Sequence, residues 1–128
     1  MLQLVMIGIG GFIGAVLRYL TSDLVQRLSG SGFPYGTLAV NALGCLVIGF
    51  LAVLAEERGI FTPEARALVF VGVLGAFTTF STFSYETSNL LRSGQALPAL
   101  LNIGVQIGLG LVAVWTGMQL ALRFFRAM

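Results

Sequence analysis

The chain has 128 residues, of which 57% are hydrophobic and only 9% are charged, with a formal net charge of +2. A soluble domain typically carries about 25% charged residues, so this chain has too few to cover a water-facing surface. Its seven basic residues are all scattered arginines, histidine is absent, and Cys45 is the one cysteine. This composition predicts an integral membrane protein and excludes the basic stripe of a nucleic-acid-binding protein, a disulfide framework and an enzyme built on a thiol, histidine or metal centre.

Four apolar segments are each long enough to cross the hydrocarbon core, which takes about 20 residues. They run over about 4–25, 36–55, 67–90 and 97–122. The first has no basic stretch before it and no small-residue cleavage site after it, so we expect a retained helix rather than a signal peptide. Short connections rich in glycine, proline and serine separate the segments. The predicted fold is therefore all-α: a single domain of four transmembrane helices, with consecutive helices antiparallel.

Four crossings place both termini and the connection between the second and third segments on one side of the membrane. The basic residues expected on that side are Arg58, Arg66, Arg123 and Arg126, and those on the other are Arg27 and Arg92. Arg18 lies inside the first segment, nearer to the second group. The positive-inside rule needs a clearer bias than this to set one orientation. The sequence is therefore compatible with insertion in both orientations.

Glycine pairs spaced four residues apart predict close helix contacts in lipid. The first segment contains Gly10 and Gly14, and the fourth contains Gly104 and Gly108. Both pairs are expected to lie where a neighbouring helix crosses.

The stretch 72–84 lies midway along the third segment. Its glycines and its two adjacent threonines are poor helix formers. Hydroxyl groups can satisfy backbone groups that a helix break would free, and free carbonyls at a break are ligands for a hard cation. One interpretation is a helix broken near the bilayer centre, and the other is a continuous helix whose small polar residues pack against neighbours. The recurrence of Phe77, Phe80 and Phe83 between hydroxyl residues favours the break.

Two other segments carry polar side chains at matching depths. Thr37 and Asn41 are four residues apart on the second segment, as are Asn102 and Gln106 on the fourth. At 1.5 Å per residue, Asn41 and Asn102 each lie roughly 8 Å inside the membrane. Because a buried amide is costly unless it is paired, these residues form either interhelical hydrogen bonds or a polar track.

The groups along such a track suit an anion. Amide N–H and hydroxyl O–H groups are hydrogen-bond donors, and the edges of phenylalanine rings carry partial positive charge. No central lysine or arginine is placed to trap an ion, and conduction requires that the ion can leave. A cation pathway would more often show acidic rings, whereas Glu86 is the only acid in the third and fourth segments and lies near the end of the third. A second, inverted copy of the chain would complete the track.

Three motifs carry a resemblance to a known family. They are a glycine-rich first segment with Arg18, Gly-Thr-Leu-x-x-Asn at 36–41, and the stretch 72–84 followed by Glu86. Over nearly its full length the sequence resembles the small fluoride channels called Fluc or CrcB. The resemblance implies an antiparallel dual-topology homodimer in the cell inner membrane, with two fluoride pores.

The resemblance also implies roles for individual residues. Phe80 and Phe83 match the phenylalanines whose ring edges face fluoride, Asn41 matches the pore asparagine, and Ser81 and Thr82 match hydroxyl positions of the pathway. With Thr37 and Gln106 added from the polar track, the expected fluoride pathway is Thr37, Asn41, Phe80, Ser81, Thr82, Phe83 and Gln106.

Backbone carbonyls of Gly75 and Thr78 match those that hold a structural sodium ion between two subunits of the family. Along the fourth segment the sequence departs from the family. Asn102, Gln106 and Gly110 stand where family members carry serine or other polar residues.

The expected function is passive export of fluoride from the cytoplasm, which lowers its toxicity. One alternative is a small multidrug-type proton-coupled transporter, which would need a titratable acid inside the membrane. Another is one subunit of a heteromeric channel.

Overall fold

The computed structural model of the chain describes residues 1–57 and 59–126, and the regular structure in these residues is helical. The first, second and last helices are α1 (Leu2–Ser29), α2 (Tyr35–Glu57) and α6 (Ala96–Arg126). Between them lies Pro63–Arg92, called helix three here. It is divided into α3 (Pro63–Arg66), the π-helix η1 (Ala67–Leu74), α4 (Gly75–Phe77) and α5 (Phe80–Arg92). Among the described residues four spans are long and apolar enough to cross a membrane, which confirms the predicted four-helix architecture.

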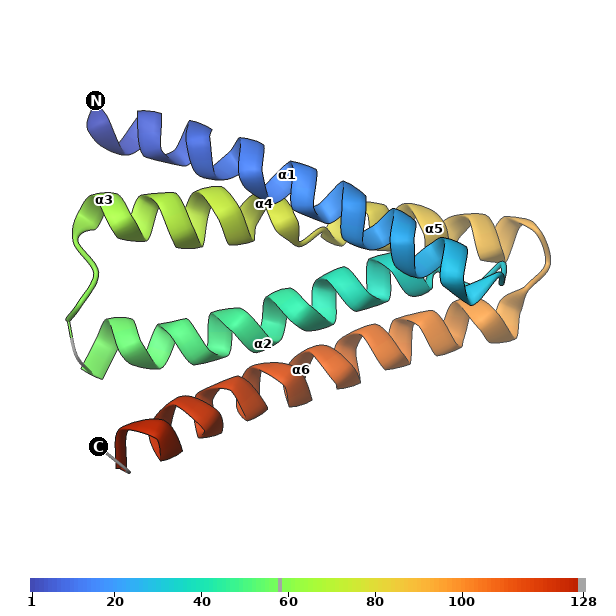
Figure 1. Cartoon of the computed structure of the whole chain (residues 1–128). Coiled ribbons are helices and arrows are strands. Elements are labelled where there is room, and N and C mark those ends of the chain that lie inside the picture. The colour runs from blue at the N-terminus through green and yellow to red at the C-terminus, as the bar shows by residue number, and fades with distance from the viewer. Residues whose placement is uncertain (58, 127–128) are drawn as a thin grey trace.

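The chain termini and the connections between helices lie at the two ends of the helix bundle (Figure 1). Both termini and the α2–α3 connection lie at one end, and the α1–α2 and α5–α6 connections lie at the other, as predicted. α1 packs along η1 and α4, and α2 packs along α6. Arg58, one of the basic residues expected at the terminal end, lies outside the described residues.

Close helix contacts in both pairs depend on glycine. In the first pair, a Cβ atom at Gly14 would overlap the backbone carbonyl oxygen of Val73, and one at Gly72 would lie 2.8 Å from the Cα of Gly10. In the second pair, a Cβ at Gly117 would overlap the carbonyl oxygen of Leu46. The prediction for Gly10 and Gly14 is thus confirmed.

The second predicted glycine pair behaves differently. Gly104 and Gly108 have no heavy atom within 4 Å of where a Cβ would stand, leaving aside their own helix backbone. Within one chain this pair is not at a helix crossing, and the prediction is wrong there, because α2 meets α6 through Gly49 and Gly117 instead. The pair faces outward on α6.

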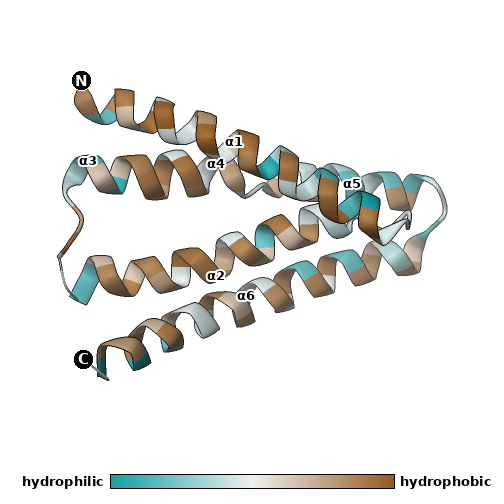
Figure 2. Ribbon diagram, viewed as in Figure 1, coloured by the Kyte–Doolittle hydropathy of each residue, from teal (hydrophilic) through white to brown (hydrophobic). Residues whose placement is uncertain are grey.

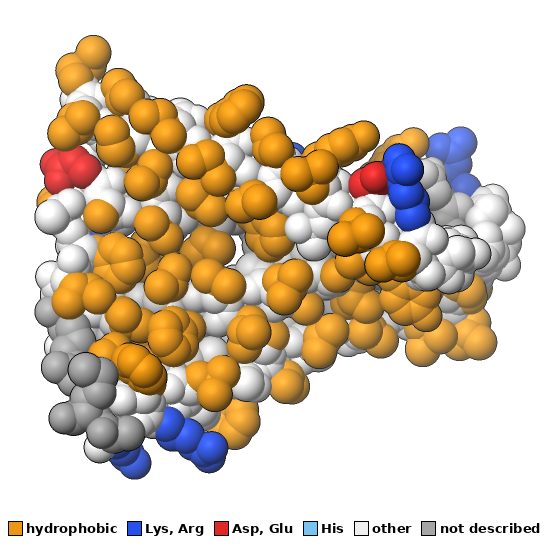
Figure 3. Space-filling model, viewed as in Figure 1, with side chains coloured by type: hydrophobic (Ala, Val, Ile, Leu, Met, Phe, Trp, Pro, Cys, Tyr) orange, Lys and Arg blue, Asp and Glu red, His pale blue; other side chains and the backbone are white. Residues whose placement is uncertain are grey.

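The surface matches a lipid environment. Hydrophobic side chains are spread over the visible face, and charged side chains gather mainly at the two ends (Figure 3). Hydrophilic residues are concentrated toward the α5 end of the bundle (Figure 2). The polar part of the molecule is therefore the half that contains α5.

The α1–α2 connection is tied to α1 by a single side chain. Gln26 donates hydrogen bonds from Nε2 to the carbonyl oxygens of Ser31 (2.9 Å) and Phe33 (3.1 Å), and its Oε1 accepts one from the Gly36 N–H (3.1 Å). These three bonds fix the first turn of α2, which contains Thr37.

Candidate ion site at the helix break

Helix three is broken at two residues, Thr78 and Thr79. Both have extended backbone angles, with φ −82° and ψ 156° at Thr78 and φ −152° and ψ 115° at Thr79. The Thr79 hydroxyl oxygen accepts a hydrogen bond from the Thr82 N–H (3.2 Å) and so caps α5, as threonine often does. This confirms the broken-helix interpretation over the continuous helix. Thr79 was absent from the predicted site, although a threonine directly before a helical segment is a capping signal.

Asn41 of α2 bridges the break. Its Oδ1 accepts a hydrogen bond from the Thr79 N–H (2.8 Å), and its Nδ2 donates one to the Thr79 carbonyl oxygen (3.1 Å). The same Nδ2 donates a second bond to Oε1 of Gln106 on α6 (3.2 Å). One amide therefore satisfies both backbone groups of Thr79 and joins α2, helix three and α6.

Gln106 lies beside a small pocket. The pocket is about 230 Å³ in volume and is lined by Asn41, Thr78, Thr79, Phe80, Phe83, Gln106 and Ile107; it is called the break pocket here. Gln106 is only 9% exposed, and its Nε2 is buried with no hydrogen-bond partner among the described residues. A buried amide nitrogen without an acceptor is costly.

The two phenylalanines predicted for the pathway meet at this pocket. The ring centroids of Phe80 and Phe83 are 5.4 Å apart, with the ring planes tilted by 59°. Phe83 is 8% exposed, whereas Phe80 is 79% exposed in the isolated chain. Both rings line the break pocket, and the edge of a phenylalanine ring is the positive part of its quadrupole.

The hydroxyl groups of α5 fall into two sets. In the first turn, Thr82 Oγ1 accepts a hydrogen bond from Thr79 Oγ1 (3.0 Å), which leaves the Thr82 hydroxyl hydrogen outside that bond. Ser81 lies 3.3 Å from the same Thr79 oxygen. Further along, three hydroxyls donate to the carbonyl four residues earlier: Ser84, Thr87 and Ser88. The hydroxyl hydrogens of these three are engaged, so among the serine and threonine hydroxyls of α5 the donors suited to an anion are confined to its start.

Thr37 lies away from the break pocket. Its hydroxyl donates a hydrogen bond to Oε1 of Glu86 (2.8 Å), so its hydrogen is engaged. Thr37 lines a larger pocket of about 420 Å³ between α1, α2 and α5, together with Arg18. Thr79 and Thr82 also line it, and Thr79 lines both pockets. The two pockets therefore meet at the helix break.

Asn102 of α6 is hydrogen-bonded to α5. It is fully buried and donates to the Thr87 hydroxyl (2.9 Å), which in turn donates to the Phe83 carbonyl oxygen (2.8 Å). Asn102 does not line the break pocket. The sequence left two interpretations for Asn102, an interhelical hydrogen bond or a place on a polar track, and the structure shows the hydrogen bond. Gly110 lies near Cys45, whose sulfur is 3.6 Å from where a Gly110 Cβ would stand.

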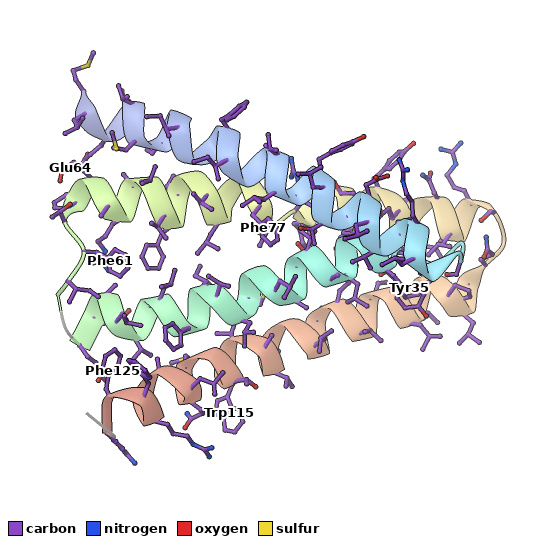
Figure 4. All side chains as sticks on the ribbon, viewed as in Figure 1. Tyr35, Phe61, Glu64, Phe77, Trp115 and Phe125 are labelled. Carbon is purple, nitrogen blue, oxygen red and sulfur yellow. The ribbon has the colours of Figure 1, made fainter. Side chains whose placement is uncertain are left out.

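Two backbone carbonyls on the α4 side lack their usual helical donors. A continuous helix would donate the Thr79 N–H to the Gly75 carbonyl and the Thr82 N–H to the Thr78 carbonyl. Here the first goes to Asn41 and the second to the Thr79 hydroxyl. Gly75 and Thr78 both line a pocket of about 220 Å³ between α2 and helix three. Phe77 points into the space between these elements (Figure 4). Carbonyl oxygens of this kind are suitable ligands for a hard cation.

The fold and this site define a class: a small multi-pass membrane protein whose polar site is built on a broken transmembrane helix. A family model described as "CrcB-like protein, Camphor Resistance (CrcB)" matches residues 5–118. The chain belongs to the CrcB family.

Individual relatives extend this similarity over almost the whole chain. A protein of Hydrogenovibrio crunogenus named "Fluoride-specific ion channel FluC" is 45% identical, with 97% of this chain and 94% of that protein covered. A Sulfurovum protein of the same name is 48% identical, with 95% of each chain covered. A Chlorobaculum tepidum protein of that name is 46% identical, with 94% of this chain and 95% of the relative covered.

Proposed function

We propose that this chain forms a fluoride-selective passive channel that exports fluoride from the cytoplasm across the cell inner membrane. The observation that carries the proposal is its identity of 45–48% to proteins named as fluoride-specific ion channels over at least 94% of its length. The break pocket agrees with it, because two amide side chains and two phenylalanine rings line it, and amide N–H groups and positive ring edges suit a small anion. No charged side chain lines that pocket to hold an ion there.

A passive pore is sufficient for this function. Hydrogen fluoride crosses membranes as a neutral acid and dissociates inside, which traps the fluoride ion. The inside-negative potential then drives the anion outward, by about 2.3 kcal/mol per 100 mV. A proton-coupled transporter would instead need an acid that binds and releases protons within the membrane. Glu86 is the one acid of α5, and it is engaged by Thr37 outside the break pocket.

The functional unit that we propose is an antiparallel homodimer with a structural sodium ion. Two features support a second copy: Phe80 is exposed beside the break pocket, and the Gly104–Gly108 pair faces outward. The carbonyls of Gly75 and Thr78, freed from their helical donors, fit a sodium ion, and two chains would supply four such ligands. Native mass spectrometry should give the mass of two chains plus one sodium ion, and a monomer would contradict this assembly.

A growth experiment tests the function in cells. A bacterium that lacks its own fluoride exporter is transformed with this gene alone. It should grow at fluoride concentrations that stop the empty-vector strain, because the pore would keep the cytoplasmic concentration low. Growth from the single gene also argues against an obligatory second subunit. Lack of protection by a chain that is present in the membrane would contradict the proposal.

A further inference from the structure

We propose that Gln26 is a positioning residue for ion passage: it caps α2 from the neighbouring helix α1, and the capped turn presents Thr37 to the carboxylate of Glu86. Gln26 and Thr37 both line the larger pocket, which meets the break pocket at Thr79. Gln26 acts through Thr37 and not by contact with the ion. This inference rests on the proposed function, because it concerns the wall of a pocket that leads to the helix break.

The first turn of α2 lacks a local capping side chain. α2 begins at Tyr35, so the capping position is held by Pro34, whose side chain has no oxygen to accept a hydrogen bond. A capping side chain usually accepts from the N–H group two or three residues later. Here the Gly36 N–H, two residues after Pro34, donates to Oε1 of Gln26 instead (3.1 Å). Gln26 therefore caps α2 from another helix.

Both ends of the Gln26 amide are engaged. Its Oε1 accepts the Gly36 N–H, while its Nε2 donates to the carbonyl oxygens of Ser31 (2.9 Å) and Phe33 (3.1 Å) in the α1–α2 connection. Peptide N–H groups only donate and peptide carbonyls only accept, so these partners determine which way the amide points. A side chain of the same length without an amide would lose the cap and the bonds to the connection together.

A second contact on the same face of α1 holds the same turn. Ser22 lies four residues before Gln26, and residues with this spacing share a helix face. A Cβ atom at Gly36 would stand 2.5 Å from the backbone carbonyl oxygen of Ser22, so glycine lets α2 approach α1 closely here. The position of this turn is therefore set by α1, through packing at Ser22 and hydrogen bonding at Gln26.

The next residue of the turn joins α2 to α5. Thr37 is 3% exposed, and its hydroxyl donates to Oε1 of Glu86 (2.8 Å). Among the described residues this is the one side-chain hydrogen bond between α2 and α5. The other carboxylate oxygen of Glu86, Oε2, is buried with no hydrogen-bond partner in the same part of the chain. The carboxylate of Glu86 thus depends on Thr37, and Gln26 sets the turn that carries Thr37.

The first test measures fluoride efflux from liposomes containing Gln26→Met. Methionine keeps an unbranched side chain of similar length but removes the acceptor for the Gly36 N–H and both donors. We expect the efflux rate to fall about 3- to 30-fold, the factor that corresponds to the loss of a helix cap. Wild-type efflux from a folded Gln26→Met protein would overturn the inference while leaving the proposed function intact.

The matched control for this variant is Gln95→Met. Gln95 is an exposed glutamine of the α5–α6 connection, at the same end of the bundle, and it lines none of the three pockets. Gln95→Met should retain the wild-type efflux rate. An equal loss of efflux in Gln95→Met and Gln26→Met would contradict a specific role for Gln26.

The second test separates positioning from a purely structural role. In protein labelled with ¹³C at glutamate, the infrared carboxyl band of Glu86 is the one that is missing from Glu86→Gln. Thr37→Val should shift this band because it removes the hydrogen-bond donor, and Gln26→Met should shift it in the same direction. A general loss of stability would lower the unfolding temperature without shifting the band. An unshifted Glu86 band in either variant would overturn the positioning role.

A third measurement needs no variant. The first N–H groups of a helix have no partner within that helix, yet the Gly36 N–H has one in Gln26. Hydrogen exchange at Gly36 should therefore be slow in the wild-type protein. Fast exchange at Gly36 would contradict the cap. Absence of fluoride efflux from wild-type protein would instead overturn the proposed function, and it would leave the exchange result unaffected.

Discussion

Phe80→Ile is expected to reduce fluoride efflux by about tenfold or more while leaving a folded chain, a factor that corresponds to about 1.4 kcal/mol of lost stabilisation. The ring lines the break pocket, and its centroid lies 5.4 Å from that of Phe83. Isoleucine has no ring and therefore none of the positive edge that an aromatic side chain offers. Phe80 is 79% exposed in the isolated chain, so its replacement removes little packing within the subunit.

The matched control for this variant is Phe12→Ile. Phe12 is a similarly exposed phenylalanine on α1 that lines none of the three pockets described above. Initial efflux rates at equal protein density should be wild-type for Phe12→Ile and reduced for Phe80→Ile. Equal rates for both variants would show that the ring edge of Phe80 has no part in the pathway.

Gly14→Ala is expected to destabilise the fold by about 1–3 kcal/mol, the usual cost of overpacking a tight contact. The added methyl group would overlap the backbone carbonyl oxygen of Val73. Because the clash is with backbone, it can be relieved only by moving α1 away from η1, and η1 leads directly into the broken part of helix three. We therefore expect a lower unfolding temperature in detergent and lower fluoride efflux.

Gly8→Ala on the same helix provides the comparison. No heavy atom lies within 4 Å of where its Cβ would stand, leaving aside neighbouring residues of its own helix backbone. Alanine is also the better helix former, so the unfolding temperature of Gly8→Ala should equal or exceed that of wild type. If Gly14→Ala unfolds at the same temperature as Gly8→Ala, the close α1–η1 contact is not a feature of the protein in solution.

The helices and the break could be predicted from sequence because both depend on residue type. Long apolar segments have one stable form in lipid, the helix, since it satisfies its own backbone groups. Adjacent threonines after a glycine weaken a helix at a predictable place, and the break at Thr78 and Thr79 lies there. Phe80, Phe83 and Gln106 were predicted to belong to one pathway, and they line one pocket.

The partners of each polar group could not be predicted in this way. Thr37 was predicted as part of the pathway, but its hydroxyl hydrogen is directed to Glu86, 49 residues away in sequence. Asn41 was expected to offer donors to an anion, whereas both of its N–H groups are engaged by Thr79 and Gln106. Backbone groups carry no side-chain signature, so a bond between an amide and the peptide groups of Thr79 appears only when the chain is folded.

The most direct measurement of the central claim is fluoride efflux from liposomes containing the purified protein. Release is followed with a fluoride electrode after a potassium ionophore is added, and chloride release is followed in parallel vesicles. The account predicts rapid fluoride release that needs no proton gradient, with no chloride release above that of protein-free vesicles. Folded, reconstituted protein that releases no fluoride, or that releases chloride equally fast, would contradict a fluoride-selective passive channel.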